Sequence, residues 1–99
     1  MNKFEELVQA DVPVLVDFFA TWCGPCQALA PVLEELHAEM GDRVKIIKID
    51  IDKNEALAAA MKVRSVPTLM IYKDGEQKWR GVGLHSRSDL KALLEQYGA

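Results

Sequence analysis

Several features that would tie the chain to a membrane, a nucleic acid or an export route are missing from its 99 residues. No apolar run approaches the roughly 20 residues that a membrane-spanning helix needs. The formal net charge is -3, whereas binding to nucleic acid phosphates favours a basic surface. The first residues, MNKFEELVQADVP, carry acidic side chains where a secretory signal would be apolar. We therefore expect a cytoplasmic protein that binds neither membranes nor nucleic acids.

Internal repeats, low-complexity tracts and linkers are also missing. Apolar residues make up 49% of the chain and charged residues 27%, which is the balance of a globular protein. A chain of this length has room for one hydrophobic core. We therefore expect residues 1–99 to form a single domain.

The spacing of apolar residues predicts an alternation of helices and strands. Helices are expected at residues 2–10, 26–40, 54–61 and 86–97, and strands at 14–19, 44–49, 68–73 and 77–82. The early alternation favours parallel strands joined by right-handed crossovers, and the closing hairpin, which turns at Asp74-Gly75, adds antiparallel ones. The prediction is an α/β fold with a mixed four-stranded sheet and helices on both faces.

Three local details of these helices can be predicted. Asn2 is expected to cap the first helix, with Glu5 in the capping-box position three residues later. Leu7 is expected on the buried stripe of the same helix. Asn54 is expected to cap the third helix.

The chain has two cysteines, Cys23 and Cys26, separated by two residues. A zinc site usually needs four ligands, and His37 lies eleven residues beyond Cys26 on the same predicted helix, about 16 Å away at helical rise. A structural disulfide that closes so short a loop gains little entropy, and the cytoplasm keeps thiols reduced. Of the metal, structural and redox interpretations, we favour redox exchange.

The position of the cysteines suggests different roles for them. Cys23 follows a predicted strand at the start of a helix, where free N–H groups and the helix dipole stabilise an anion. The pKa of its thiol should therefore be lowered, which makes Cys23 the attacking sulfur, and Cys26, one turn further on, the resolving one. Pro25 suits an early helix position, and Gly24 lets another backbone approach the sulfur.

The segments VDFFATWCGPC, KIDIDKN, SVPTLMIYKDGE and GVG resemble the thioredoxin family, from about Val14 to the carboxyl terminus. The resemblance implies the thioredoxin fold and a general protein-disulfide reductase. It implies no bound cofactor, protein disulfides as substrates, and a flavin- and NADPH-dependent thioredoxin reductase as electron donor. The Gly-Pro pair resembles that of the reducing members. A disulfide oxidant or isomerase, and a non-enzymatic subunit or scaffold, are the alternatives.

Asp17 lies within an apolar strand, where a carboxylate is expensive to bury. It could be a structural acid paired with a lysine, or burial could raise its pKa so that it exchanges protons with Cys26. The resemblance matches Asp17 to the buried aspartate behind the resolving cysteine and favours the second role. Lys48, on the neighbouring strand, could reach Asp17, although a lysine in a strand is more often solvated.

The resemblance also implies a surface that docks substrates. Pro67 could simply be tolerated as the residue that opens a strand, but in the family the peptide after Val66 is cis and faces the cysteines. The backbone there would pair with an extended substrate segment. Val82 and Gly83 match another part of this surface. Trp22 would form its rim, unless it is a core aromatic.

The chain departs from the family pattern in two places that matter. The family usually begins with an edge strand before its first helix, whereas this chain starts with that helix. We expect strand 44–49 to be an exposed edge in a monomer, with a weak dimer through this edge as the alternative. Gln27 stands where a lysine often follows the second cysteine, and the lost charge should raise the pKa of Cys23 somewhat.

Overall fold

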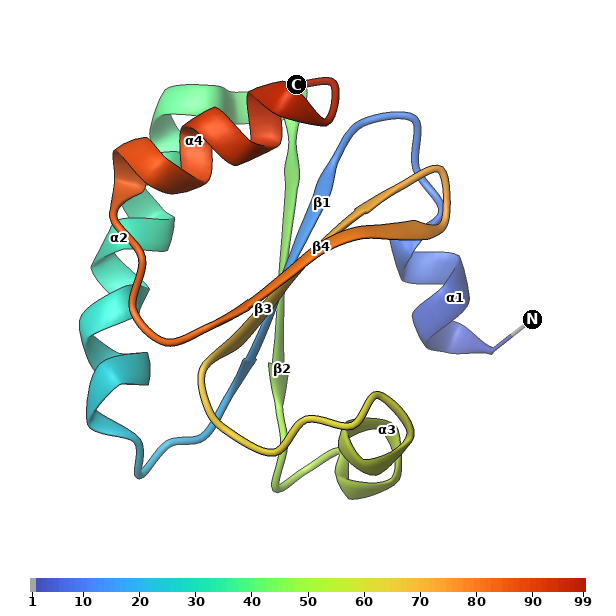
Figure 1. The fold of residues 1–99 in the computed structure, drawn as a ribbon, viewed down its shortest axis with the longest axis vertical. Helices are drawn as coiled ribbons and strands as arrows, with labels where there is room; N and C mark the ends of the chain where they lie inside the picture. The colour runs from blue at the N-terminus through green and yellow to red at the C-terminus, as the bar shows by residue number, and fades with distance from the viewer. Residues whose placement is uncertain (1) are drawn as a thin grey trace.

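The structure is a computed structural model that describes residues 2–99. Helices and strands alternate along this range, followed by a hairpin and a final helix (Figure 1). The elements are α1 (Lys3–Val8), β1 (Val14–Phe19), α2 (Gly24–Met40), a 3₁₀ turn (Gly41–Arg43), β2 (Lys45–Asp50), α3 (Glu55–Ala60), β3 (Thr68–Lys73), β4 (Glu76–Val82) and α4 (Arg87–Gln96). The predicted order of elements is confirmed, with boundaries displaced by one or two residues.

Residues 2–99 contain one four-stranded sheet in the order β2-β1-β3-β4. β1 runs parallel to β2 and antiparallel to β3, and β3 and β4 form an antiparallel hairpin. The helices α2 and α4 lie on one side of the sheet, and α1 and α3 lie on the other (Figure 1). The predicted mixed sheet with helices on both faces is therefore confirmed, and β2 lies at one edge of it.

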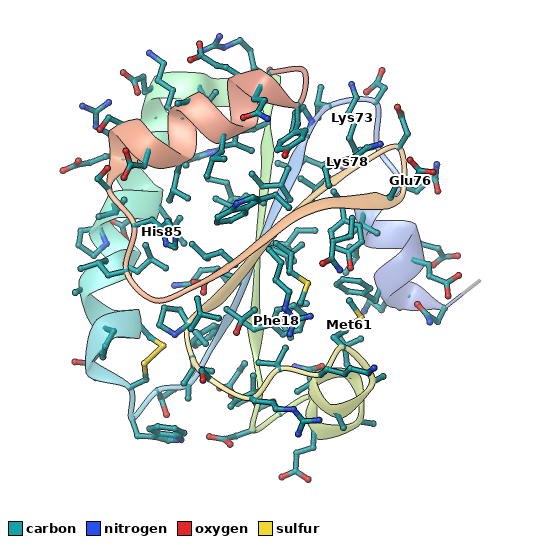
Figure 2. The ribbon with its side chains drawn as sticks, in the orientation of Figure 1. Phe18, Met61, Lys73, Glu76, Lys78 and His85 are labelled. Carbon is teal, nitrogen blue, oxygen red and sulfur yellow. A yellow bond between two sulfur atoms is a disulfide. The ribbon has the colours of Figure 1, made fainter. Side chains whose placement is uncertain are left out.

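Each face of the sheet carries its own apolar core, because successive side chains of a strand point to opposite faces. Leu15 of β1 belongs to the core beneath α2 and α4. Val14, Val16 and Phe18 belong to the core beneath α1 and α3. Figure 2 shows Phe18 and Met61 on this second side of the sheet. Burying each of these large side chains stabilises the fold by roughly 1.5–3 kcal/mol.

The short helix α1 follows the predicted capping, but one of its buried positions was predicted wrongly. The side-chain oxygen of Asn2 accepts the N–H of Glu5 at 2.8 Å, and its amide donates to the Glu5 carboxylate at 3.1 Å. Phe4 and Val8, one turn apart, contact the sheet. Leu7 is 40% exposed, because so short a helix buries only this narrow stripe.

The long helix α2 begins two residues earlier than predicted, because Cys23 is its N-cap and Pro25 occupies the first turn. The helix ends at Gly41, whose φ of 54° lies in the left-handed region. It therefore starts directly after the loop that leaves β1, and the two cysteines lie at this junction.

Asn54 does not cap α3 as predicted. It occupies the N-cap position, but its side chain makes no capping hydrogen bond. Its amide instead donates to the carbonyl oxygen of Asp50 at 2.9 Å, which ties the turn after β2. An asparagine side chain can bond the preceding or the following backbone, and here the strand end competes successfully with the helix.

Of the helices within residues 2–99, none combines the length and the apolar character that crossing a membrane would require.

Candidate active site

Cys23 and Cys26 form a disulfide at the amino-terminal end of α2, seen as the yellow bond in Figure 2. Their Cα atoms are 5.3 Å apart. Cys23 caps the helix, since its Sγ accepts the N–H of Cys26 at 3.1 Å. The two residues are 5% and 6% exposed, so exposure alone does not separate an attacking from a resolving sulfur. What separates them is that Cys23 occupies the cap and Cys26 lies within the helix.

The loop before β3 lies against the disulfide. The peptide between Val66 and Pro67 is cis, as the resemblance implied. The Cys23 Sγ is 3.6 Å from the carbonyl oxygen of Val66, a van der Waals contact in the oxidised pair. The Thr68 hydroxyl donates to the Ser65 carbonyl at 2.6 Å and fixes this loop at the start of the strand. The backbone of Val66 is thus brought beside the sulfur from 43 residues away.

The loop after β4 continues the same surface. The N–H of Gly83 donates to the carbonyl of Pro67 at 2.9 Å, which joins the two loops. Gly83 has a φ of 93°, a conformation that side-chain-bearing residues rarely adopt. Val82 is 58% exposed and the adjacent Leu84 is 55% exposed. The sequence did not point to Leu84, and an apolar residue in a loop was the signal that could have found it.

Trp22 projects from the loop before α2 and is 68% exposed. Its indole N–H donates to the Asp52 carboxylate at 2.9 Å, so the ring is held in one orientation. Asp52 is a further functional candidate that the sequence did not reveal, because it follows β2, 30 residues away in the chain. Trp22 is therefore an exposed side chain anchored by Asp52, and not a core aromatic.

Gly24 and Pro25 are exposed on the first turn of α2. A Cβ added to Gly24 would meet no atom of this chain within 4 Å. A larger side chain would therefore fit at this position without a clash within the chain. The space beside Gly24 is open.

Asp17 is 1% exposed in the middle of β1. Its Oδ1 has no hydrogen-bond partner among residues 2–99. Burial raises the pKa of this carboxyl to about 6, and the positive charge of Lys48 opposes part of that rise. A carboxyl that titrates in this range can accept and release a proton near neutral pH.

Lys48 does not form the ion pair with Asp17 that we considered. The two residues are neighbours in the β1–β2 register. The Lys48 ammonium group instead lies 5.0 Å from the centre of the Phe19 ring, in a cation–π contact. Lys48 also lines a recess of about 250 Å³ together with Cys26 and Gln27. Lys48 and Cys26 thus line the same open recess, whereas Lys48 acts on Asp17 only through the electrostatic effect of its charge.

Comparisons with known proteins agree with this geometry. The family model described as Thioredoxin matches residues 1–96. The chain is 50% identical to a thioredoxin from Bacillus subtilis over 84 residues, which cover 85% of this chain and 81% of the relative. It is 45% identical to a thioredoxin from Rickettsia bellii over 86 residues, 87% of this chain and 82% of the relative. The chain belongs to the thioredoxin family.

The fold of a solved family member is closely similar. A mutant thioredoxin from Halobacterium salinarum superposes with a TM-score of 0.88 at 46% identity, covering 100% of this chain and 86% of that one. Thioredoxins are thiol-disulfide oxidoreductases that act on disulfide substrates, and here Cys23 and Cys26 stand at disulfide distance as the redox-active pair. The redox interpretation of the two cysteines is confirmed.

Gln27 marks a difference from the thioredoxin pattern next to this pair. Its side-chain amide donates to the carbonyl oxygen of Thr21 at 3.0 Å. The bond links the first turn of α2 to the loop that carries Trp22. The sequence suggested only a lost positive charge at this position. The structure shows in addition that Gln27 holds the loop before α2 through its bond to Thr21.

Within residues 2–99, no group of three or more histidine, cysteine, aspartate or glutamate side chains is arranged to hold a metal ion. Cys23 and Cys26 are the redox-active groups of the site, and Asp17 is a buried titratable group in β1, the strand that leads to it.

Proposed function

We propose that residues 1–99 act as one domain that reduces protein disulfides in the cytoplasm, with Cys23 as the attacking sulfur. The observation that carries the proposal is the cap of α2, where the Cys26 N–H is directed at the Cys23 Sγ. In the reduced protein the same N–H and the helix dipole favour a thiolate on Cys23.

The reaction proceeds by two thiol–disulfide exchanges. The Cys23 thiolate attacks one sulfur of the target disulfide, a mixed disulfide forms, and the other target sulfur leaves as a thiolate. The Cys26 thiolate then attacks the Cys23 sulfur, which releases the second target thiol and closes the Cys23–Cys26 disulfide. Two electrons pass from the cysteine pair to the target.

Asp17 accepts the proton of Cys26 before the second exchange. The support for this role is its burial, its unpartnered Oδ1 and its pKa of about 6. Lys48 assists from the recess beside Cys26, where its charge favours the ionised forms of both groups.

The target docks as an extended segment across Trp22, the Val66–Pro67 loop and the Val82–Gly83 loop. The exposed apolar side chains of this surface and the open space over Gly24 support this position. The Val66 carbonyl lies beside the sulfur, and in this proposal it pairs with the backbone of the segment. A flavin- and NADPH-dependent thioredoxin reductase then restores the dithiol, and the chain itself binds no cofactor.

Trapping experiments test the roles of the two cysteines. The Cys26→Ser variant should accumulate covalent mixed disulfides with target proteins, because the second exchange is removed. The matched Cys23→Ser variant should trap none. The assignment is wrong if only the Cys23→Ser variant traps targets.

The alternatives predict different outcomes in two solution measurements. A reductase accelerates the dithiothreitol-driven precipitation of insulin, whereas a non-enzymatic scaffold would leave the rate unchanged. The reduction potential of the Cys23–Cys26 couple separates a reductase from an oxidant or isomerase. We expect a value near that of reducing family members, about −270 mV, and a value near −120 mV would indicate an oxidant.

A further inference from the structure

The chain between β4 and α4, which we call the β4–α4 loop and define as residues 82–86, inverts the usual distribution of polar and apolar side chains. Leu84 is 55% exposed, whereas the next residue, His85, is partly buried. Leucine is among the residues most often buried in folded proteins, and histidine is buried less often. Four large apolar side chains are exposed within residues 2–99, and two of them, Val82 and Leu84, belong to this loop. The loop therefore presents apolar side chains to the outside while a polar ring takes the inward position.

A hydrogen bond holds His85 in the inward position. Its Nδ1 lies 2.9 Å from the carbonyl oxygen of Gly83. Because a carbonyl oxygen can only accept a hydrogen bond, the proton must be on Nδ1 and the ring donates it. The two partners flank Leu84 in the chain, so the bond limits the conformations that the backbone can adopt at Leu84.

The imidazole of His85 also contacts Trp79 of β4. The two rings are perpendicular, with an interplanar angle of 87° and centroids 5.4 Å apart. Trp79 packs against the core beneath α2 and α4, and Figure 2 shows His85 on this side of the sheet. A Cβ on Gly81 would lie 2.6 Å from the Trp79 ring and 3.3 Å from Cε1 of His85. The absence of a side chain at Gly81 therefore lets the indole ring reach along the strand to His85.

Gly83 joins the β4–α4 loop to the active site. Its carbonyl oxygen accepts the bond from His85, and its N–H donates to the carbonyl of Pro67 at 2.9 Å. Pro67 follows Val66, whose carbonyl oxygen lies 3.6 Å from the Sγ of Cys23. A continuous series of contacts therefore connects His85 to the loop beside the reactive sulfur.

We propose that His85 is a positioning residue for the reduction of target disulfides, because it holds Leu84 exposed where it contacts the docked target. The inference rests on the proposed function, in which the target lies as an extended segment across the Val66–Pro67 and Val82–Gly83 loops. Residues of such a segment follow one another at about 3.3 Å, so side chains two or three positions from the target cysteine lie against the β4–α4 loop. Leu84 thereby favours targets that carry an apolar side chain near the reactive cysteine.

The direct test compares two seven-residue peptides whose central cysteine is bonded to thionitrobenzoate, which is coloured when released. One peptide has leucine two positions before and after the cysteine, the other has serine at both, and the remaining residues are alanine. The Cys23 thiolate attacks the peptide sulfur and thionitrobenzoate leaves. Cys26 then attacks Cys23, which releases the peptide thiol and closes the Cys23–Cys26 disulfide.

The measured quantity is the second-order rate constant for the release of thionitrobenzoate by the reduced protein. The wild-type constant should be several-fold larger for the leucine peptide than for the serine peptide, because only leucine gains from contact with Leu84. Equal constants for the two peptides would overturn the proposal.

Two substitutions of His85 separate the hydrogen bond from the ring. His85→Asn places an amide N–H near the position of Nδ1 and keeps a donor for Gly83, whereas His85→Phe keeps a ring beside Trp79 but has no donor. His85→Phe should lose the preference for the leucine peptide, and His85→Asn should retain most of it. A residue that only fills space would not be rescued by asparagine. Equal effects of the two substitutions, or the reverse order, would overturn the proposal.

Leu84→Ser removes the contact itself. Because Leu84 is exposed, the variant should fold as the wild type does, and the preference for the leucine peptide should disappear. Leu7→Ser is the matched control, since it removes an apolar side chain that is 40% exposed on α1, and it should leave the preference unchanged. A preference that survives Leu84→Ser, or one that Leu7→Ser abolishes to the same extent, would overturn the proposal.

The chemical shifts of the imidazole nitrogens test the hydrogen bond itself. In the neutral ring of His85 they should show the proton on Nδ1. A proton on Nε2 would leave Nδ1 facing the Gly83 carbonyl without a hydrogen and would overturn the proposal.

The symmetrical disulfide of thionitrobenzoate, which carries no peptide, separates this inference from the proposed function. The His85 and Leu84 variants should reduce it at the wild-type rate, because Cys23 and Cys26 are unchanged. A slower reaction in His85→Phe would mean that His85 acts on the sulfurs and not on docking, which would also overturn the proposal. If the wild-type protein reduces neither this reagent nor the peptides, the reductase proposal itself is wrong. If it reduces all of them without a preference for leucine, only the role of His85 is refuted.

Discussion

The amino-terminal ends of α2 and α4 have the same capping geometry and very different surroundings. Cys23 Sγ accepts the N–H of Cys26 at 3.1 Å, and Ser86 Oγ accepts the N–H of Asp89 at 3.1 Å. Both cap residues have extended backbones. Cys23 is buried against the Val66 carbonyl, however, whereas Ser86 is exposed at the surface.

The comparison shows that a capped helix end is a general structural device that becomes reactive only under two further conditions. The cap atom must be able to carry a negative charge near neutral pH, which a thiol does and a hydroxyl does not. The second condition belongs to the proposed function and is a substrate-docking surface around the cap atom, which at Cys23 would be formed by Trp22 and the loop of Val66. The α4 end meets neither condition and serves stability alone.

The largest effect is expected from Cys23→Ser, which gives α2 the cap atom that α4 has. The rate of insulin reduction should fall on the order of a thousandfold or more, because the hydroxyl cannot attack a disulfide at neutral pH. The free energy of unfolding of the reduced protein should change by less than about 1 kcal/mol, since serine is also a good N-cap. Urea denaturation in dithiothreitol measures the second quantity, and a loss of several kcal/mol would show that the thiol is needed for folding.

Asp17→Asn tests the buried carboxyl of β1, the strand that precedes α2. The folded-state pKa of Asp17 is raised from 3.8 to about 6, so the charged form is disfavoured and wild-type stability is lost as pH rises from about 4 to 6. The variant should therefore be more stable than wild type above pH 6, by on the order of 2–3 kcal/mol, and nearly equal to it at pH 4.

Urea denaturation of both proteins at pH 4, 5, 6 and 7.5 checks this prediction. The difference in unfolding free energy should appear only across the upper part of the range. Insulin reduction by Asp17→Asn should also slow, and its pH dependence near 6 should disappear. An unchanged pH profile would remove Asp17 from the proton transfer.

Ser86→Ala removes the N-cap of α4, the helix that takes no part in the proposed reaction. The protein should lose about 1 kcal/mol of stability, because the N–H of Asp89 loses its acceptor. Insulin reduction should stay at the wild-type rate, since α4 takes no part in the active site. Ser88→Ala is the comparison variant: the Ser88 hydroxyl lies 3.3 Å from the cap hydroxyl of Ser86, but the N–H of Asp89 keeps its acceptor in this variant, so the loss of stability should be smaller. A slower reductase would mean that the two helix ends are coupled.

Gln27→Lys should have the smallest effect and separates charge from the tether to Thr21. The added positive charge near Cys23 favours the thiolate, so alkylation of Cys23 by iodoacetamide at pH 6.5 should become a few-fold faster. Gln27→Leu removes the hydrogen bond without adding charge and should not accelerate alkylation. Equal acceleration in the two variants would assign the effect to the loop and not to the charge.

The patterns that were read correctly from the sequence are local ones. The strand of β1 and the stripe of α2 repeat over many residues, so errors at single positions do not hide the element. The Trp-Cys-Gly-Pro-Cys segment contains the cap, the early proline and both sulfurs in five consecutive residues. The order of elements and the redox chemistry could therefore be predicted before any coordinates.

The predictions that failed concerned single side chains that each had two possible environments. Leu7 was expected to be buried and is exposed, and Asn54 bonds to the strand end and not to the helix. For Lys48 the sequence left a pairing with Asp17 open, and the structure shows a contact with Phe19. In each case the outcome depends on how segments that are distant in the chain pack together, or on which of two backbone groups a side chain bonds.

Local spacing was thus enough to establish the αβαβαββα order, the mixed sheet and the reactive pair at the start of α2, because hydrophobic periodicity and capping act over a few residues. The tertiary structure alone decided that the Val66 carbonyl lies beside Cys23, that Asp52 holds the ring of Trp22, and that Oδ1 of Asp17 has no hydrogen-bond partner within residues 2–99. The physical reason is that burial and polar pairing depend on which segments are packed together, and the sequence pattern of one segment does not contain that information.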